Sequence, residues 1–273
     1  MSNASLKPIT VWGHAIGPNP LKVRMILEEL GLPYEYKIVD FTDMKKEPYL
    51  TLNPNGRVPA IEDPNTGLTL WESGPIVEYL VEQYDKDHKI SYDSFTEKYQ
   101  IKQWIGYQIS GKDLRFPFRI ELGRLGVVDA NVYEISGQGP YYGQGVWFAL
   151  FHHEKVPSAV ERYLKEAERV RSVLDLHLSR RAGEKQGARV AEKDVWLVGD
   201  KITVADLSWF IWEQIIQFLQ GRLGVSIEEG KYPHYEAWYK KIEERPSAQQ
   251  AIHSRNEGLK NVQLPAQTEQ ATE

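Results

Sequence analysis

The sequence predicts a small α/β domain followed by an all-helical domain. Over residues 8–88, short apolar runs typical of strands alternate with amphipathic stretches typical of helices, in the order β-α-β-α-β-β-α. From 94 to 257, apolar residues recur with the period of an α-helix, about 3.6 residues. A length of 273 residues is enough for two domains with their own cores. Residues 258–273 are polar and are expected to form a tail.

The first domain begins with a strand and a helix. The apolar run at 9–13 predicts a strand, and Asn19 followed by Pro20 predicts a helix start with Asn19 as the N-cap. The helix carries apolar residues spaced i, i+3, i+4 and i+7, and Gly31 is placed to end it. A second strand is expected over 34–41.

A hairpin and a further helix complete this domain. After a polar, partly helical stretch, VPAIE (58–62) and LTLW (68–71) read as strands, and DPNTG (63–67) reads as the turn between them. Ser73 and Gly74 then open a helix that runs to about residue 84.

The second domain is predicted from amphipathic helical stretches that begin after a boundary near residues 88–94. Each stretch has one apolar face, so together they are expected to enclose a core. The stretches are YQIKQWIGYQI (99–109), SAVERYLKEAERVRSVLDLHL (158–178), TVADLSWFIWEQIIQFL (203–219) and PHYEAWYKKIEERPSAQQAI (233–252).

The composition excludes several classes of function. With no cysteine, the chain has no disulfide, no thiolate metal site and no thiol nucleophile of its own. The net charge of −5 gives no general attraction to nucleic acid or to anionic membranes. We expect no metal, and we take the adjacent His152 and His153 as structural. Neither a secretory signal nor a membrane span is predicted, so we expect a cytoplasmic protein.

Three short segments of the first domain could contact a ligand. In GPNPLKV a helix starts after a strand, and its free N–H groups suit a thiolate or carboxylate; alternatively, Asn19 is only a cap. In NGRVPA, a cis Val58-Pro59 bond would turn the Val58 backbone toward a peptide-like ligand; alternatively, Pro59 is an ordinary edge-strand proline. In WESGP, Ser73 could bind a carboxylate and Glu72 an ammonium group; alternatively, they form a plain cap pair.

Taken together, these segments, the element order and the helical second domain resemble a glutathione transferase over residues 8–255. GQGPYYGQGVWF, FHHEKVPSAVERY and WLVGDKITVADLSW are similar to the fungal class related to the yeast nitrogen-regulator prion protein, and to bacterial nu-class enzymes. The resemblance implies a thioredoxin-like first domain. It also implies a structural capping box on a buried helix, with Thr203 as N-cap and Asp206 at position N3.

The resemblance implies glutathione as co-substrate and matches its contacts to positions of this chain. Asn19 matches the catalytic asparagine near the glutathione sulfur, and Gly17 stands where some nu-class enzymes carry a threonine. The Tyr, Ser or Cys that activates the thiol in other classes has no clear match. The matched binding positions are Lys45 for the glycyl carboxylate (through an alignment that needs a gap), Arg57 and Val58 for the cysteinyl backbone, and Glu72 and Ser73 for the γ-glutamyl head.

Aromatic residues of the second domain are candidates for an electrophile pocket. Aromatic residues make up 11% of the chain, which suits a flat apolar ligand, although a packed helical core would use them too. About half of the candidates are therefore expected in the core. The candidates are Trp104, Tyr107, Tyr141, Tyr142, Trp147 and Phe148.

The function implied by the resemblance is conjugation of glutathione to hydrophobic electrophiles, with possible peroxidase activity toward organic hydroperoxides. One alternative is a disulfide reductase that uses two glutathione molecules, since the chain has no cysteine. Another is a non-catalytic binding or regulatory protein of the same fold. The resemblance also implies a homodimer.

One internal segment interrupts the resemblance. YQISG (107–111) is echoed by YEISG (133–137), and removing the 26 residues 112–137 leaves an uninterrupted match to the family. Possible codons at Gly111-Lys112, Ala130-Asn131 and Ser136-Gly137 resemble splice signals. We therefore predict that about residues 112–136 are a translated intron and pack poorly against the rest of the protein. The residues on either side of this segment are then expected to form one helix. The alternative is a genuine insertion that walls the electrophile pocket with Phe116 and Phe118.

Overall fold

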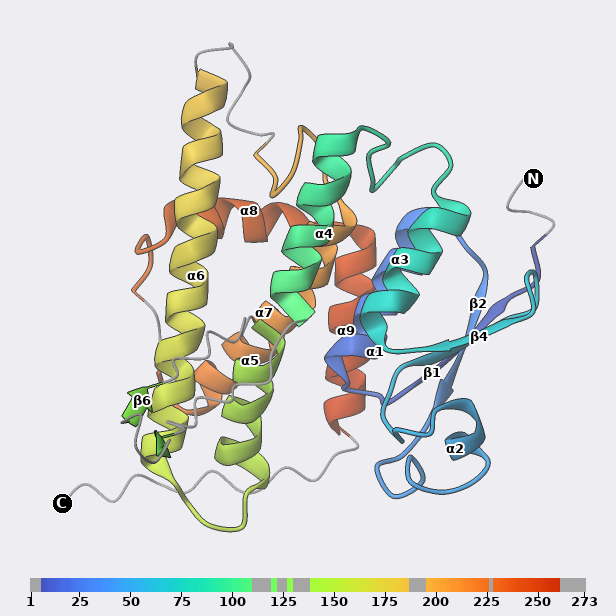
Figure 1. The fold of residues 1–273 in the computed structure, drawn as a ribbon, viewed down its shortest axis with the longest axis horizontal. Coiled ribbons are helices and arrows are strands. Elements are labelled where there is room, and N and C mark those ends of the chain that lie inside the picture. Colours follow the sequence, from blue (N-terminus) through green and yellow to red (C-terminus); the bar gives the residue numbers. More distant parts are fainter. Residues whose placement is uncertain are drawn as a thin grey trace.

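The computed structural model of the protein describes residues 6–109, 119–121, 127–129, 138–186, 195–225 and 228–260. A four-stranded mixed sheet with its helices stands on one side of the molecule, and a bundle of helices stands on the other (Figure 1). This is the predicted α/β domain followed by a helical domain. In the described part, no helix is both long and apolar enough to cross a bilayer.

The sheet brings three chain segments to one edge. Its strand order is β2-β1-β3-β4; β1 pairs parallel with β2 and antiparallel with β3, and β3 pairs antiparallel with β4. Ala60, at the start of β3, lies opposite both Trp12 and Trp71. The ends of β1 and β4 and the start of β3 therefore meet. The strands are β1 (Ile9–Gly13), β2 (Tyr34–Ile38), β3 (Ala60–Asp63) and β4 (Leu68–Trp71).

Three helices belong to the sheet domain: α1 (Pro18–Leu30), the short α2 (Tyr49–Leu52) and α3 (Ser73–Tyr84). Helices α1 and α3 lie between the sheet and the helical domain (Figure 1). Gly31 ends α1 with φ of 63°, a conformation that favours glycine, as predicted.

The predicted role of Asn19 as the N-cap of α1 is wrong. The helix begins at Pro18, Gly17 is the N-cap, and Asn19 is the second residue of the first turn. The first backbone bond of the helix runs from the Leu21 N–H to the Gly17 carbonyl, 3.2 Å. Both Pro18 and Pro20 fit the first turn, where N–H groups have no helical partner, so the helix can start before the first proline.

The helical domain contains α4 (Phe95–Ile109), α5 (Gln138–Val146), a π-helical turn η3 (Trp147–Phe151), α6 (Pro157–Gln186), α7 (Val204–Arg222), α8 (Pro233–Glu243) and α9 (Pro246–Lys260). The stretch 233–252, read from the sequence as one amphipathic unit, is divided because Pro246 cannot continue α8. At this corner, the Arg245 guanidinium bonds the Glu29 carboxylate of α1 at 2.6 and 2.8 Å.

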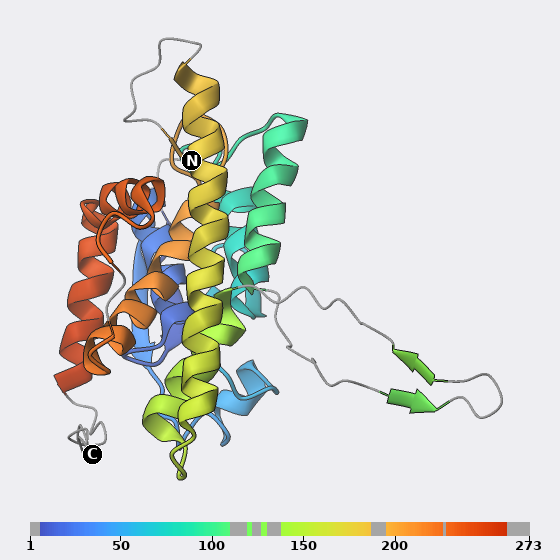
Figure 2. The ribbon, with the colours of Figure 1, turned by 90° about the vertical axis from the view of Figure 1, so that its left-hand side faces the viewer.

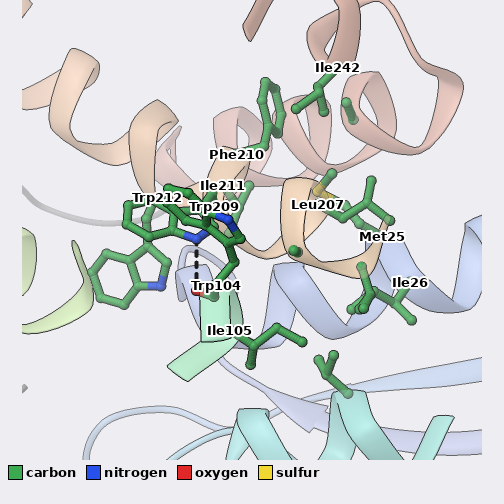
Figure 3. Packing of buried hydrophobic residues seen from close by; sticks show 14 of the residues in the cluster. Met25, Ile26, Trp104, Ile105, Leu207, Trp209, Phe210, Ile211, Trp212 and Ile242 are labelled. Atoms are coloured by element: carbon green, nitrogen blue, oxygen red, sulfur yellow. Dashed lines mark hydrogen bonds between the residues drawn. The ribbon is translucent and has the colours of Figure 1, made fainter. Parts of the chain in front are cut away.

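Helix α7 supplies much of the core of the helical domain, and its Leu207 and Phe210 are among the buried side chains drawn in Figure 3. Trp209 of α7 is fully buried, and its indole N–H donates to the Trp104 carbonyl of α4 at 3.0 Å. The expected capping box is present: Thr203 and Asp206 bond each other's backbone groups at the start of the helix. Asp206 also accepts from the Leu197 N–H at 2.9 Å and the Trp238 indole at 2.8 Å.

Most of the segment predicted to derive from an intron lies outside the described residues. Within it, β5 (Arg119–Glu121) and β6 (Val127–Asp129) pair antiparallel and stand apart from the helices (Figure 2). On either side, the end of α4 and the start of α5 are close, because a Cβ on Gly139 would lie 3.3 Å from the Gln108 carbonyl. The intron origin itself stays a prediction.

Candidate active site

A cleft of about 320 Å³ lies between the sheet domain and the helical domain. The sheet domain contributes the loop after β1, the start of α1 and the segment before β3. The helical domain contributes almost only apolar groups, from α5, η3, α7 and α9. The lining residues are His14, Ile16, Gly17, Pro18, Asn19, Pro20, Phe41, Met44, Arg57, Val58, Gly143, Val146, Leu150, Phe151, Trp212, Ile215, Phe218, Arg255 and Leu259.

Asn19 supplies the donors at the start of α1. Because Pro18 and Pro20 have no N–H, Asn19 is the only one of the first three helical residues with a backbone N–H to offer. Its side-chain oxygen accepts a hydrogen bond from the Trp212 indole at 3.1 Å. An indole can only donate, so this bond fixes which end of the amide is oxygen and leaves the NH₂ as a donor. An anion in the cleft could therefore meet two donors from one residue.

The backbone around Val58 is available to a peptide-like ligand. The Arg57 carbonyl accepts from the Tyr49 hydroxyl and the Asn53 amide, both at 2.6 Å, which fixes the segment from behind. The Val58-Pro59 peptide bond is cis. Since β3 begins at Ala60, Val58 lies outside the strand ladder. Its N–H and carbonyl can then pair with an extended chain.

Ser73 and Glu72 form the start of α3. Ser73 is 4% exposed, and the helix has no side-chain cap. The N–H groups of Ser73 and Gly74 belong to the first turn and have no helical partner. Glu72 has φ of 71°, which is strained for a residue other than glycine. Buried, uncapped N–H groups next to strained backbone are typical of an anion site.

The sheet register places the segments that lead to Asn19, Val58 and Ser73 at one edge, because β1 and β4 end there and β3 begins there. Lys45 lies farther out on the surface. Its ammonium donates to the Asn55 carbonyl at 2.6 Å and covers Gly56, which has φ of 58°. Lys45, Glu72 and Ser73 are not among the residues that line the cleft itself.

Lys22 is a charged residue of this region that the sequence reasoning missed. It lies one turn after Asn19, is 1% exposed, and donates to the Gln108 side chain at 3.1 Å. Burial lowers the pKa of Lys22 to about 7, and the nearby Glu72 carboxylate acts in the opposite direction. A lysine in the middle of an amphipathic helix looks solvent-exposed in a sequence, so only the packing of α4 reveals its burial.

Four of the six aromatic candidates for the electrophile pocket, Trp104, Tyr107, Tyr141 and Trp147, are not among the residues that line this cleft. Trp104 is buried against Trp209, with ring centroids 5.8 Å apart, and Tyr107 packs on the same indole at 5.1 Å. Tyr141 is 2% exposed in the core, and Trp147 stacks on Phe151 with 49% of its surface exposed. A helical period identifies the apolar face of a helix, but it does not tell an aromatic side chain in the core from one in a pocket.

Of the two further aromatic candidates, Tyr142 is fully buried and donates to Glu213 at 2.6 Å, and Phe148 lines a different groove. The apolar wall consists instead of the residues named above from α5, η3, α7 and α9. Missed residues of the cleft include His14, whose pKa is lowered by burial, and Trp212, which orients Asn19. No group of His, Asp and Glu in the described residues could hold a metal ion.

The chain matches two family profiles, Glutathione S-transferase, N-terminal domain, over residues 16–83, and Glutathione S-transferase, C-terminal domain, over residues 140–246. It is 43% identical over 249 residues to the Glutathione S-transferase-like protein tpcF of Aspergillus fumigatus, covering 90% of this chain and 96% of that protein. It is 32% identical over 275 residues to Protein URE2 of Debaryomyces hansenii, covering 92% and 79%.

Among solved structures, the chain is similar to the glutathione transferase URE2P8 from Phanerochaete chrysosporium, determined with oxidized glutathione. The TM-score is 0.72 at 34% identity, and the match covers 94% of this chain and 98% of that one. Both halves of the fold are included in these matches. The chain therefore belongs to the glutathione S-transferase family, with Ure2-like and transferase-like fungal proteins as its relatives.

Proposed function

We propose that this protein conjugates glutathione to apolar electrophiles, with a secondary peroxidase activity toward organic hydroperoxides. One observation supports this above the others: the segments that lead to Asn19, Val58 and Ser73 start from one sheet edge, beside a cleft whose far wall is apolar. In this arrangement Asn19 faces the sulfur, Val58 pairs with the cysteinyl backbone, and Ser73 with Glu72 holds the γ-glutamyl head. Arg57 contacts the cysteinyl backbone of glutathione, and Lys45 binds its glycyl carboxylate.

Activation of the glutathione thiol requires only a small preferential stabilisation of the thiolate by the protein. A free thiol with a pKa of about 8.5 is a few per cent thiolate at neutral pH. Lowering that pKa by about two units requires about 2.7 kcal/mol of preferential binding of the thiolate. Two hydrogen bonds from Asn19 can supply it, at about 1.5–3 kcal/mol each, with the dipole of α1 adding to them.

The reaction then follows without a protein nucleophile. The thiol proton passes to solvent, and the thiolate electron pair forms a C–S bond with the electrophile. In a substitution, the leaving group departs with its bonding pair; in an addition, the π pair moves onto the electrophile and a solvent proton completes the adduct. We also propose that the protein acts in the cytoplasm as a homodimer, as the family resemblance implies.

Two other functions, disulfide reduction and non-catalytic regulation, are each supported by one of the similar proteins. A disulfide reductase that uses two glutathione molecules is favoured by the URE2P8 relative, whose structure contains oxidized glutathione. A non-catalytic regulatory role is favoured by the similarity to Protein URE2.

A kinetic panel with glutathione separates these possibilities, using a chloronitroaromatic, an organic hydroperoxide and a small disulfide. Turnover of the first or second supports the proposal, and turnover of the disulfide alone supports the reductase. Tight glutathione binding without turnover of any of the three would leave the regulatory role.

A further inference from the structure

Arg255 is the only charged side chain that the described helical domain contributes to the cleft. It belongs to α9, and the other lining groups from that domain are apolar, apart from the Trp212 indole that already bonds Asn19. Arg255 is 7% exposed, so its charge sits under an apolar surface rather than in solvent. A buried arginine in such a wall requires an explanation, because buried charges are normally paired.

The contacts of Arg255 are with neutral oxygens. Its Nη1 donates to the Gln214 carbonyl at 3.0 Å and to the Gln214 side chain at 3.1 Å, and its Nη2 donates to Asn256 at 3.1 Å. No ion pair to Arg255 occurs within the described residues. The nearby Tyr239 hydroxyl and the Gln214 amide, which donates to Glu243 at 3.1 Å, lie between Arg255 and that carboxylate. Its Nε–H is buried and has no hydrogen-bond partner there.

The position of Arg255 places this charge beside the reacting end of the cleft. A Cβ on Gly258, one turn further along α9, would lie 2.9 Å from Ala15 and 3.0 Å from Ile16, in the loop that leads into α1. Leu259 lies one turn from Arg255 on the same face and also lines the cleft. Helix α9 runs beside α1 in the fold (Figure 1).

We infer that the cleft selects apolar electrophiles that carry an acidic oxygen group, a carboxylate in the first instance, and that Arg255 is the residue that recognises it. The inference rests on the proposed function, because it concerns the second substrate of that reaction. The guanidinium is held in place by Gln214 and Asn256, so it is preorganised. Two of its five donors, the Nε–H and the second Nη2–H, have no partner among the described residues, and with its unpaired charge they favour an anion. The apolar wall takes the rest of the molecule.

The test uses ethacrynic acid and its methyl ester, which share one α,β-unsaturated ketone and differ only in the remote carboxylate. The native protein should conjugate the acid with a kcat/KM at least about tenfold above that of the ester, as expected for a hydrogen bond to a charged group. Each rate is divided by the uncatalysed rate with glutathione. An acid-to-ester ratio of one or less in the native protein would overturn the inference.

Two variants assign the preference to Arg255. Arg255→Gln should bring the acid-to-ester ratio of kcat/KM close to one, and Arg255→Lys should keep part of the preference for the acid. The acid-to-ester ratio of kcat/KM does not depend on the fraction of the variant that is folded. If Arg255→Gln lowers both rates equally and raises the pKa of bound glutathione, the residue serves the thiolate, and the inference is wrong.

A binding measurement separates this inference from the proposed function. Calorimetry with the two preformed glutathione conjugates needs no turnover. Tighter binding of the acid conjugate to the native protein, lost in Arg255→Gln, supports the carboxylate site even if neither electrophile is turned over. Equal binding of both conjugates contradicts it even if the protein is an active transferase.

Discussion

The helix starts of this protein differ in whether a side chain accepts hydrogen bonds from their first N–H groups. We call a start closed where a side chain does so and open where none does. At the start of α7, Thr203 and Asp206 satisfy the first-turn groups with side chains, and at the start of α8, Asp175 of α6 accepts from two N–H groups at 2.9 and 3.0 Å. The starts of α1 and α3 have no side-chain cap. At α3 the uncapped start is buried, and at α1 two prolines leave the Asn19 N–H as the one free donor among the first three residues. We propose that a ligand completes both starts.

The largest change in the free energy of unfolding is expected at the closed start of α7. Asp206→Ala removes the acceptor for Thr203, Leu197 and Trp238, all buried, and should lower the free energy of unfolding by about 4 kcal/mol or more. Urea denaturation measures this loss. Glutathione affinity of the fraction that remains folded should be unchanged; a specific loss of affinity would show that this start also belongs to the site.

At an open start the effect should fall on binding instead. Ser73→Ala should weaken glutathione binding by about 1.5–3 kcal/mol, the range for a hydrogen bond to a charged group, with little change in the unfolding midpoint. Calorimetry with glutathione gives the affinity. Ser91→Ala, which changes a buried serine that donates to Asp85 beyond the other end of α3, is a control for the affinity alone. Unaltered affinity in Ser73→Ala would reduce Ser73 to a structural residue.

Lys22, under the open start of α1, predicts a pH dependence. Its folded pKa of about 7 lies below the unfolded value, so between these values the unfolded chain binds more protons and stability rises with pH. From pH 7 to 9, the native protein should gain about 2 kcal/mol relative to Lys22→Met. Parallel stability curves for the two proteins would show that Lys22 keeps an ordinary pKa when folded.

The smallest free-energy change is expected for Asn19→Ala, which removes the amide donor but leaves the backbone N–H. The pKa of bound glutathione should rise by about one unit, kcat/KM should fall about tenfold, and glutathione affinity at neutral pH should change less. Ultraviolet titration of the bound thiolate measures the pKa. Trp212→Phe, which releases the Asn19 side chain without removing it, should give a smaller shift in the same direction. If the pKa stays the same in Asn19→Ala, another group activates the thiol.

The sequence predicted much of this arrangement because its signals are local. Leu68–Trp71 and the helix start at Ser73 follow from short runs and turn residues. Asn19 was placed on the right helix but at the wrong position, because two prolines in one turn leave the start ambiguous. Burial of Lys22 and the approach of Arg255 to the cleft depend on the packing of α4 and α9, which no local pattern records.

We propose above all that the open starts of α1 and α3 hold glutathione at one sheet edge. A crystal structure of the protein with glutathione tests it most directly. The account predicts the γ-glutamyl carboxylate on the N–H groups of Ser73 and Gly74, the cysteinyl backbone along Val58, and the sulfur within hydrogen-bond distance of Asn19. Glutathione bound elsewhere, with both helix starts left open, would contradict it.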